Sequence, residues 1–312
     1  MQQSSQPGYA RLLSSFSIRT LQPHEIALAV DWAAAEGWNP GLADATCFAT
    51  VDPAGFLLGE IDGEPAATIS VVNYDDRFAF LGFYMVRAAL RGRGYGWRLW
   101  QAGMAHAGAR SVGLDGVVTQ QENYKRSGFV LACRNVRYGA VIAAPSSFPP
   151  SDLARPSMQT SVDATKPVTN GMMELAEIPF AAIVADDALV FPASRTAFLR
   201  AWIGAPGHVG RAMVRDGRLC AWGVIRPCRR GFKVAPLLAD DRASAETVFA
   251  ALVAAVSGGE IFIDVPEPNA AAVALAREAG LSPVFETARM YKGAVRPIRL
   301  ERIFGVTSFE LG

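Results

Sequence analysis

Residues 80–96 read FLGFYMVRAALRGRGYG, an apolar segment followed by a glycine-rich turn. The apolar part belongs to a strand predicted over Phe78–Val86, and a helix is predicted from Tyr95 to Gly108. The first amides of a helix lack partners within it and lie at the positive end of its dipole, so they bind phosphate readily. The three glycines let backbone amides approach a pyrophosphate, and Arg91 and Arg93 add positive charge. The segment therefore predicts a phosphate-binding turn, with a plain strand-to-helix turn as the alternative.

Two other phosphate-binding loops are excluded by the residues around these glycines. A Walker A loop requires Gly-Lys followed by Ser or Thr, and a dinucleotide loop requires the spacing G-x-G-x-x-G. Neither pattern occurs in residues 91–96.

The elements around this turn predict a mixed sheet in the first half of the chain. The Asp62-Gly63 pair is a typical hairpin turn, and only one strand-helix-strand crossover is expected. The other predicted helices cover Pro23–Glu36, Leu42–Ala49 and Glu122–Ser127. The other predicted strands are Phe16–Leu21, Phe56–Ile61, Ala66–Val72, Val112–Val118 and Phe129–Ala140.

The second half repeats this order, which indicates an internal duplication. Its predicted strands are His208–Val214, Leu219–Val224, Gly231–Leu237 and Ile261–Val265, with helices over Arg242–Val256 and Asn269–Gly280. We therefore expect an α+β fold of two modules, each a mixed, mostly antiparallel sheet flanked by helices. The predicted divisions are a flexible N-terminus (1–15), a first module (16–143), a Pro/Ser/Thr-rich linker (144–170) and a second module (171–312).

The turn resembles the coenzyme A signature of the GNAT superfamily of acyltransferases, Arg/Gln-x-x-Gly-x-Gly/Ala, because Arg91, Gly94 and Gly96 fit it in register. The resemblance implies acetyl-coenzyme A as co-substrate, with loop amides on the pyrophosphate. It also implies that the backbone at the end of the preceding strand pairs with the pantetheine arm. The residues assigned to the cofactor in this way are Met85, Val86, Arg91, Gly92, Arg93, Gly94, Tyr95 and Gly96.

A second segment, NYKRSGF over residues 123–129, resembles the family's Tyr-x-x-x-Gly-Phe segment. The resemblance implies that Tyr124 lies where the thiol leaves and protonates it, which suits a phenol with a pKa of about 10. A backbone N–H near Val86 is the expected oxyanion donor. The alternative for Tyr124 is a core aromatic that supports its helix. The family often carries an Asn one or two helix turns before this Tyr. Asn123 is directly adjacent to Tyr124, so it is not assigned that role.

Residues of the acceptor site are predicted from their loops. Trp38 and Asn39 lie between the first two helices, where GNAT proteins often contact the acceptor, and Asp75 and Tyr84 are further candidates. Asp75, Asp76, Glu36 or a water relay is the expected general base. The alternative for Trp38 is a structural role as a core tryptophan, and the alternative for the three carboxylates is a solvated position on a loop. Trp97 and Trp100 are both expected in the core.

The second half resembles the diverged C-terminal module of certain two-module GNAT proteins. Residues 234–240 hold no glycine where the first half has its loop, and Ala276 stands at the position that matches Tyr124. We therefore expect no second catalytic centre. The second module is expected to be either a scaffold or part of the acceptor pocket. The polar residues that could reach a cleft between the modules are Arg195, Arg289, Tyr291 and Glu310.

Composition narrows the class of protein. The net charge of +1 argues against a general nucleic-acid binder, and no segment has the pattern of a signal peptide or membrane span. The four cysteines and three histidines suggest free thiols in a reducing cytoplasm and no metal site.

The expected function is N-acetylation of a small-molecule amine by a monomer or homodimer. The rival functions are a non-catalytic acyl-coenzyme A sensor and an acetyltransferase of protein amines.

Overall fold

The computed structural model describes residues 15–142 and 170–312, so most of the predicted N-terminal segment and linker lies outside the described residues. The first half holds four α-helices: α1 (Ile26–Ala35), α2 (Asp44–Phe48), α3 (Tyr95–Ala107) and α4 (Gln121–Arg126). Its strands are β1 (Phe16–Thr20), β2 (Phe56–Ile61), β3 (Glu64–Asn73), β4 (Phe78–Val86), β5 (Ser111–Val117) and β6 (Val130–Ile142). These elements confirm the predicted order of the first module.

The described second half adds α5 (Phe180–Asp187), α6 (Thr196–Ile203), α7 (Arg242–Ala254) and α8 (Ala270–Glu278). Its strands are β7 (Gly171–Glu174), β8 (Val209–Arg215), β9 (Arg218–Pro227), β10 (Phe232–Ala239), β11 (Gly259–Pro266), β12 (Ser282–Lys292) and β13 (Ile303–Gly305). The strand meander and the last two helices match the predicted elements, whereas β7, α5 and α6 have no predicted counterpart.

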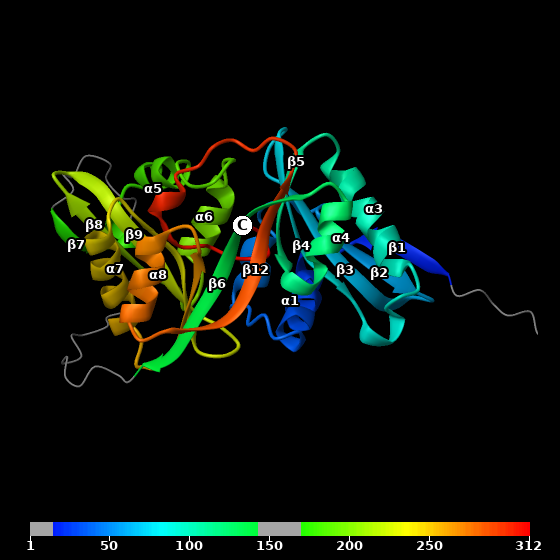
Figure 1. Cartoon of the computed structure of the whole chain (residues 1–312), viewed down its shortest axis with the longest axis horizontal. Helices are drawn as coiled ribbons and strands as arrows, with labels where there is room; N and C mark the ends of the chain where they lie inside the picture. Colours follow the sequence, from blue (N-terminus) through cyan, green and yellow to red (C-terminus); the bar gives the residue numbers. More distant parts are fainter. Residues whose placement is uncertain (1–14, 143–169) are drawn as a thin grey trace, which may run out of the picture.

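All of these strands form one continuous 13-stranded sheet, in the order β1-β2-β3-β4-β5-β12-β6-β11-β10-β9-β8-β7, with β13 paired to β10. Only the β4–β5 and β10–β11 pairs of this sheet are parallel, so the predicted mixed, mostly antiparallel class is confirmed. The long strands β6 and β12 cross the centre of the molecule side by side (Figure 1). Strand β12 of the second half thus lies between β5 and β6 of the first. The two halves are therefore joined more closely than two modules with separate sheets would be.

The hydrophobic core also crosses the boundary between the halves. Helices α1 and α2 of the first half and α5 and α6 of the second contribute to one buried cluster. At its centre the rings of Phe48 and Trp202 stack with their centroids 6.1 Å apart. Two smaller clusters lie under α3 and under α7 and α8. The packing of each half therefore depends on the other.

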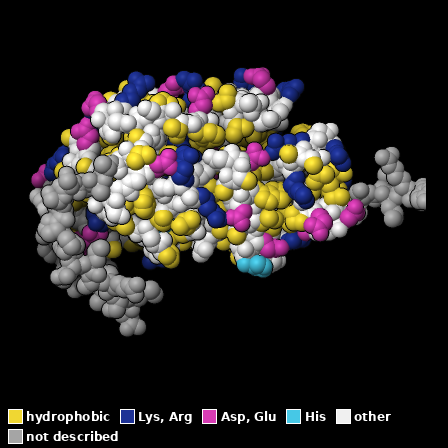
Figure 2. Space-filling model, turned by 90° about the horizontal axis from the view of Figure 1, so that it is seen from below, with side chains coloured by type: hydrophobic (Ala, Val, Ile, Leu, Met, Phe, Trp, Pro, Cys, Tyr) yellow, Lys and Arg dark blue, Asp and Glu magenta, His cyan; other side chains and the backbone are white. Residues whose placement is uncertain are grey.

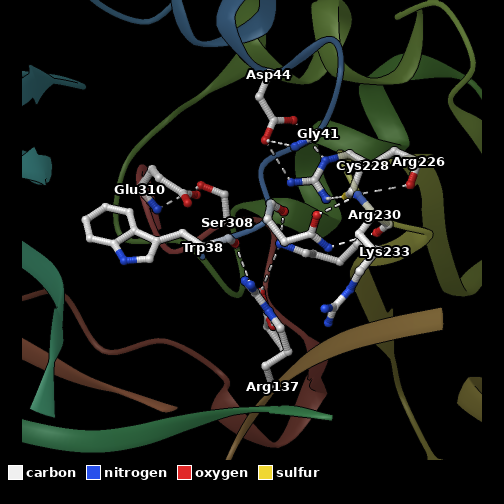
Figure 3. A network of polar contacts seen from close by, with 12 residues as sticks. Trp38, Gly41, Asp44, Arg137, Arg226, Cys228, Arg230, Lys233, Ser308 and Glu310 are labelled. Carbon is white, nitrogen blue, oxygen red and sulfur yellow. Dashed lines mark hydrogen bonds and ion pairs between the residues drawn. The ribbon is translucent and has the colours of Figure 1, made fainter. Parts of the chain in front are cut away.

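Buried ion pairs hold the two halves together beside this core, and Figure 3 shows the one between Asp44 and Arg226. Asp44 in α2 pairs with Arg226 in β9 at 3.0 Å, and both side chains are fully buried. Arg137 in β6 pairs with Asp264 in β11 at 2.6 Å. An Arg guanidinium matches a carboxylate with two parallel hydrogen bonds, so both pairs fix the halves in one orientation.

The surface and the helices agree with the composition. Figure 2 shows a face on which acidic and basic side chains are intermixed. No helix among the described residues is long and apolar enough to span a bilayer. The four cysteines are free, as predicted, and three of them are buried. The expectation of a core position for Trp97 is wrong: its exposed fraction is 56%, whereas Trp100, three residues later in α3, is buried.

Candidate active site

The parallel strands β4 and β5 separate in the middle of the first module. Their pairing runs from Phe78 opposite Ser111 to Leu81 opposite Leu114. Beyond this point a β-bulge shifts the register between β3 and β4, and Phe83 has a φ of 47°. The hydroxyl of Thr68 donates to the carbonyl of Phe83 at 2.9 Å and fixes this irregular backbone. The strands therefore diverge and leave backbone groups of β4 open toward β5.

A cavity of about 480 Å³ fills the space between the diverging strands. Every predicted cofactor residue except Arg93 lines it, from Met85 to Gly96. Gly94 has a φ of 81° and lies immediately before α3, a conformation that glycine adopts without strain. The structure thus brings the open edge of β4 and the unpaired amides at the start of α3 to the same cavity.

The positive charge at this loop is arranged differently from the prediction. Arg91 donates through Nε to the carbonyl of Val86 at 2.9 Å and forms an ion pair with Glu36. Arg93 is exposed and does not line the cavity. Glu36, a predicted candidate for the general base, therefore lies at the cavity as the partner of Arg91.

Tyr124 lines the same cavity from α4 and has an exposed fraction of 7%. Its ring stacks on Trp100, with centroids 5.8 Å apart, and meets Phe129 edge-on. Burial, with a smaller contribution from nearby Tyr84, raises the pKa of Tyr124 well above its ordinary value. The phenol is therefore fully protonated at neutral pH, as a proton donor must be.

Two of the four predicted acceptor residues line the cavity. Trp38 lies at the cavity after α1, and Tyr84 lies at the cofactor loop, because a Cβ built on Gly96 would meet its hydroxyl at 2.9 Å. Asn39 is directed away, and its side chain bonds the backbone N–H and carbonyl of Arg230. Asp75 instead accepts from the N–H of Phe78, 2.7 Å away, and closes the β3–β4 turn. Neither Asn39 nor Asp75 lines the cavity.

The second half supplies the remaining wall. Phe285 and Thr287 enter from β12, and Phe309 and Glu310 enter from the segment that follows β13. Glu310 is among the polar residues that the sequence places at a cleft between modules. The other three have no sequence signal, because their position depends on the exchange of β12 between the halves.

The equivalent opening in the second module is filled. Strands β10 and β11 pair only from Phe232–Ile261 to Val234–Ile263. Strand β13 then pairs with β10, and the N–H of Val306 donates to the carbonyl of Asp264 in β11 at 2.8 Å. In the second module, the opening that corresponds to the cavity of the first module is therefore filled by the chain itself.

Among the described residues, no group of three or more His, Cys, Asp or Glu side chains is arranged to hold a metal ion.

Known proteins are similar to this chain in sequence and in fold. The model of the acetyltransferase (GNAT) family matches residues 23–129, and that of an acetyltransferase (GNAT) domain matches residues 183–305. The holothin acyltransferase of Pseudoalteromonas sp. (strain SANK 73390) is 32% identical over 284 residues, which cover 90% of either chain.

Two solved structures show the same fold. A putative acetyltransferase from Pyrococcus horikoshii superposes with a TM-score of 0.74 at 21% identity, over 98% of this chain and 100% of that one. A tandem GNAT protein from the clavulanic acid biosynthesis pathway superposes with a TM-score of 0.58 at 15% identity, over 91% and 100%. The chain therefore belongs to the GNAT acyltransferases, with two GNAT domains in tandem, a family that uses an acyl-coenzyme A as co-substrate.

Proposed function

We propose that the protein transfers an acetyl group from acetyl-coenzyme A to the primary amine of a small molecule, by direct attack within a ternary complex. The observation that carries this proposal is the open divergence of β4 and β5, which ends at the glycine loop. The corresponding opening between β10 and β11 is filled by β13. One acyl-coenzyme A site per chain follows from this difference.

The size of the cavity supports a small acceptor. Ligand pockets of about 300–1,000 Å³ are typical for one small molecule. Here about 480 Å³ must hold both the acyl-pantetheine arm and the acceptor. The acceptor walls are the rings of Trp38, Phe285 and Phe309, which come from both halves. The name of the curated relative, a holothin acyltransferase, also favours a small-molecule acceptor over a protein amine.

The chemistry requires a neutral amine and a protonated leaving group. The amine nitrogen attacks the thioester carbonyl carbon, the C–N bond forms, and the C–S bond breaks. Tyr124 supplies the proton that the departing thiolate takes up. A backbone N–H of β4 near Val86 is the proposed donor to the oxyanion. The net proton transfer is from nitrogen to sulfur, so no further reactant is needed. The free thiols fit a location in the reducing cytoplasm.

Release of free thiol from acetyl-coenzyme A, measured across a library of small amines, tests this function. We expect thiol release that depends on both the amine and the protein, and one N-acetylated product per thiol. A panel of longer acyl-coenzyme A donors identifies the preferred acyl group. Saturable binding of acetyl-coenzyme A without amine-dependent thiol release would instead support a non-catalytic sensor.

A further inference from the structure

The segment after β13 brings the second half of the chain into the cavity of the first. Residues 306–312 are all buried. The hydroxyl of Tyr74 in the β3–β4 turn donates to the carbonyl of Leu311 at 2.8 Å. Arg195, just before α6, donates to the carbonyl of Gly312 at 3.0 Å. The hydroxyl of Ser308 accepts the N–H groups of Glu310 and Leu311. This tail is therefore held in place from both modules.

Glu310 differs from the other buried carboxylates among the described residues. The others each form an ion pair with an arginine: Asp44 with Arg226, Asp115 with Arg289, Asp186 with Arg302, Asp187 with Arg195 and Asp264 with Arg137. Glu310 has an exposed fraction of 3%, no ion pair, and no hydrogen-bond partner for Oε1 within the described part of the chain. A buried carboxylate without a partner is destabilising, so it must be explained.

The charges that surround Glu310 make it suited to exchange a proton. Burial raises its pKa above the ordinary range, opposed by Lys233 of β10, Arg137 of β6 and Arg226 of β9, and reinforced by Asp44 of α2. Glu36, which directly follows α1, and Asp115 of β5 line the same cavity, where they pair with Arg91 and Arg289. A carboxylate whose pKa is shifted toward neutrality is a more effective base at neutral pH than an ordinary glutamate.

Glu310 also lies beside the aromatic walls of the cavity. It lines the cavity together with Trp38 and Phe309. Figure 3 shows the Glu310 side chain close to the ring of Trp38. Arg137 donates to the carbonyl of Trp38 at 2.5 Å, and its guanidinium lies 5.0 Å from the centre of the Phe309 ring. These contacts fix the aromatic walls around the carboxylate of Glu310, which has no ion pair. One free carboxylate suits an acceptor with one amine, and aromatic walls suit an acceptor with a flat, apolar body.

We propose that Glu310, carried by the tail of the second module, binds the acceptor amine in the cavity of the first module and removes its proton. The inference rests on the proposed N-acyl transfer and names the base for it. The carboxylate accepts one N–H proton as the C–N bond forms and the C–S bond breaks, while Tyr124 protonates the thiolate. Proton return from Glu310 to Tyr124 through water completes the cycle. The acceptor class is a compact aromatic or heteroaromatic monoamine.

The test compares the wild-type chain with Glu310→Gln, which keeps the shape of the side chain and removes the base. The probes are acetyl-coenzyme A with benzylamine and 2-(aminomethyl)thiophene as flat monoamines, and with spermidine and glucosamine as contrasts. We expect Glu310→Gln to lower kcat/KM for the flat amines by about 100-fold or more at pH 7, the usual size of a general-base contribution. The dissociation constant of acetyl-coenzyme A and the Tm are expected to stay the same or improve.

The pH profile separates a base from a structural residue. In Glu310→Gln, the rate is expected to rise with pH in proportion to the concentration of the neutral amine. In the wild type, by contrast, the base Glu310 is expected to make the rate reach a plateau. Glu310→Asp is expected to recover part of the rate. The control is Glu301→Gln, an exposed carboxylate paired with Arg299, which is expected to keep wild-type kinetics.

The outcomes distinguish this inference from the proposed function. An active wild type whose Glu310→Gln variant keeps its rate and its pH profile would overturn the role of Glu310 and leave N-acyl transfer intact. A preference for spermidine or glucosamine would overturn the acceptor class. A wild type that binds acetyl-coenzyme A and releases no thiol with any amine would overturn the proposed function and the inference that rests on it.

Discussion

The backbone carbonyl of Glu310 lies directly against Gly82, so that a Cβ built on Gly82 would be 2.1 Å from this oxygen. Gly82 lies in β4 at the point where this strand leaves β5, and Glu310 belongs to the tail of the second module. The absence of a side chain at position 82 therefore lets the tail pass over the first module and reach its cavity. Residues of both modules therefore line one cavity at this contact.

Gly82→Ala tests this contact. The added methyl group would meet a backbone atom, which cannot move without displacing the tail. We expect a loss of about 1–3 kcal/mol in the free energy of unfolding, as for overpacked cores. Because the tail carries Glu310 and Phe309, kcat/KM for the amine is expected to fall at least tenfold. Chemical denaturation and thiol-release kinetics measure the two effects. A variant with wild-type stability and activity would show that the tail is not held at this point.

Tyr124→Phe tests whether Tyr124 donates the proton to the thiolate. Removal of the hydroxyl is expected to lower kcat by about 100-fold, the lower end of the usual contribution of general-acid catalysis. The affinity for acetyl-coenzyme A, measured by calorimetry, should not change, because the ring and its stacking on Trp100 remain. Tyr138→Phe is a matched control, since Tyr138 is also buried but does not line the cavity. An unchanged kcat would remove Tyr124 from the mechanism.

Gly94→Ala tests the loop as a phosphate site. Its φ of 81° is unfavourable for alanine by about 1–2 kcal/mol, so the loop will shift and its amides will lose their alignment. We expect the dissociation constant of acetyl-coenzyme A to rise by about 5- to 10-fold, as 1–1.4 kcal/mol of lost binding predicts. The control is Gly280→Ala, because Gly280 has a φ of 80° and equally open surroundings in the second module. Equal affinities in the two variants would contradict a cofactor role for Gly94.

Asp44→Asn tests the buried ion pair between the modules. The change leaves Arg226 charged and unpaired in the core, so we expect a loss of about 3–5 kcal/mol in unfolding free energy. The exposed pair Asp31–Arg229 is the control, and Asp31→Asn should cost under about 1 kcal/mol. Denaturant melts of both variants give the comparison. A loss in Asp44→Asn no larger than in Asp31→Asn would show that the buried pair does not hold the modules together.

The same pair predicts the direction of the pH dependence of stability. Burial opposes the charge on Asp44, but the attraction of Arg226 outweighs it and lowers the pKa of this carboxyl. A folded pKa below the unfolded value contributes stability that is complete above the unfolded pKa. This contribution is lost as the pH falls below about 4. Melts between pH 7 and pH 3 should therefore converge for the wild type and Asp44→Asn, and parallel curves would contradict the ion pair.

The sequence predicts well those parts of the site that depend on local structure. The strand over residues 78–86, the glycine loop and Tyr124 are neighbours along the chain, so motif and periodicity are enough to place them. The predicted hairpin at Asp62-Gly63 is confirmed for the same reason, since both residues have positive φ. The structure then brings Tyr124 and the loop to one cavity.

The parts of the site that depend on long-range contacts are not predictable in this way. Phe285 and Thr287 reach the cavity only because β12 pairs with β5, about 170 residues earlier in the chain, as Arg289 opposite Asp115 shows. Asn39 was expected at the acceptor and instead binds Arg230 across the module boundary. Local patterns cannot show which surface of a module will be covered by the other, so they assign such residues to the wrong face.

A crystal structure of the protein with coenzyme A tests whether the cavity between β4 and β5 is the cofactor site, because it locates the cofactor without reference to any acceptor. We expect one coenzyme A per chain, with its pyrophosphate on the amides of residues 91–96. Its pantetheine arm should lie between β4 and β5, with the sulfur near the hydroxyl of Tyr124. The opening between β10 and β11 should remain filled by β13. Coenzyme A bound in the second module, or outside the cavity between β4 and β5, would contradict this assignment of the cofactor site.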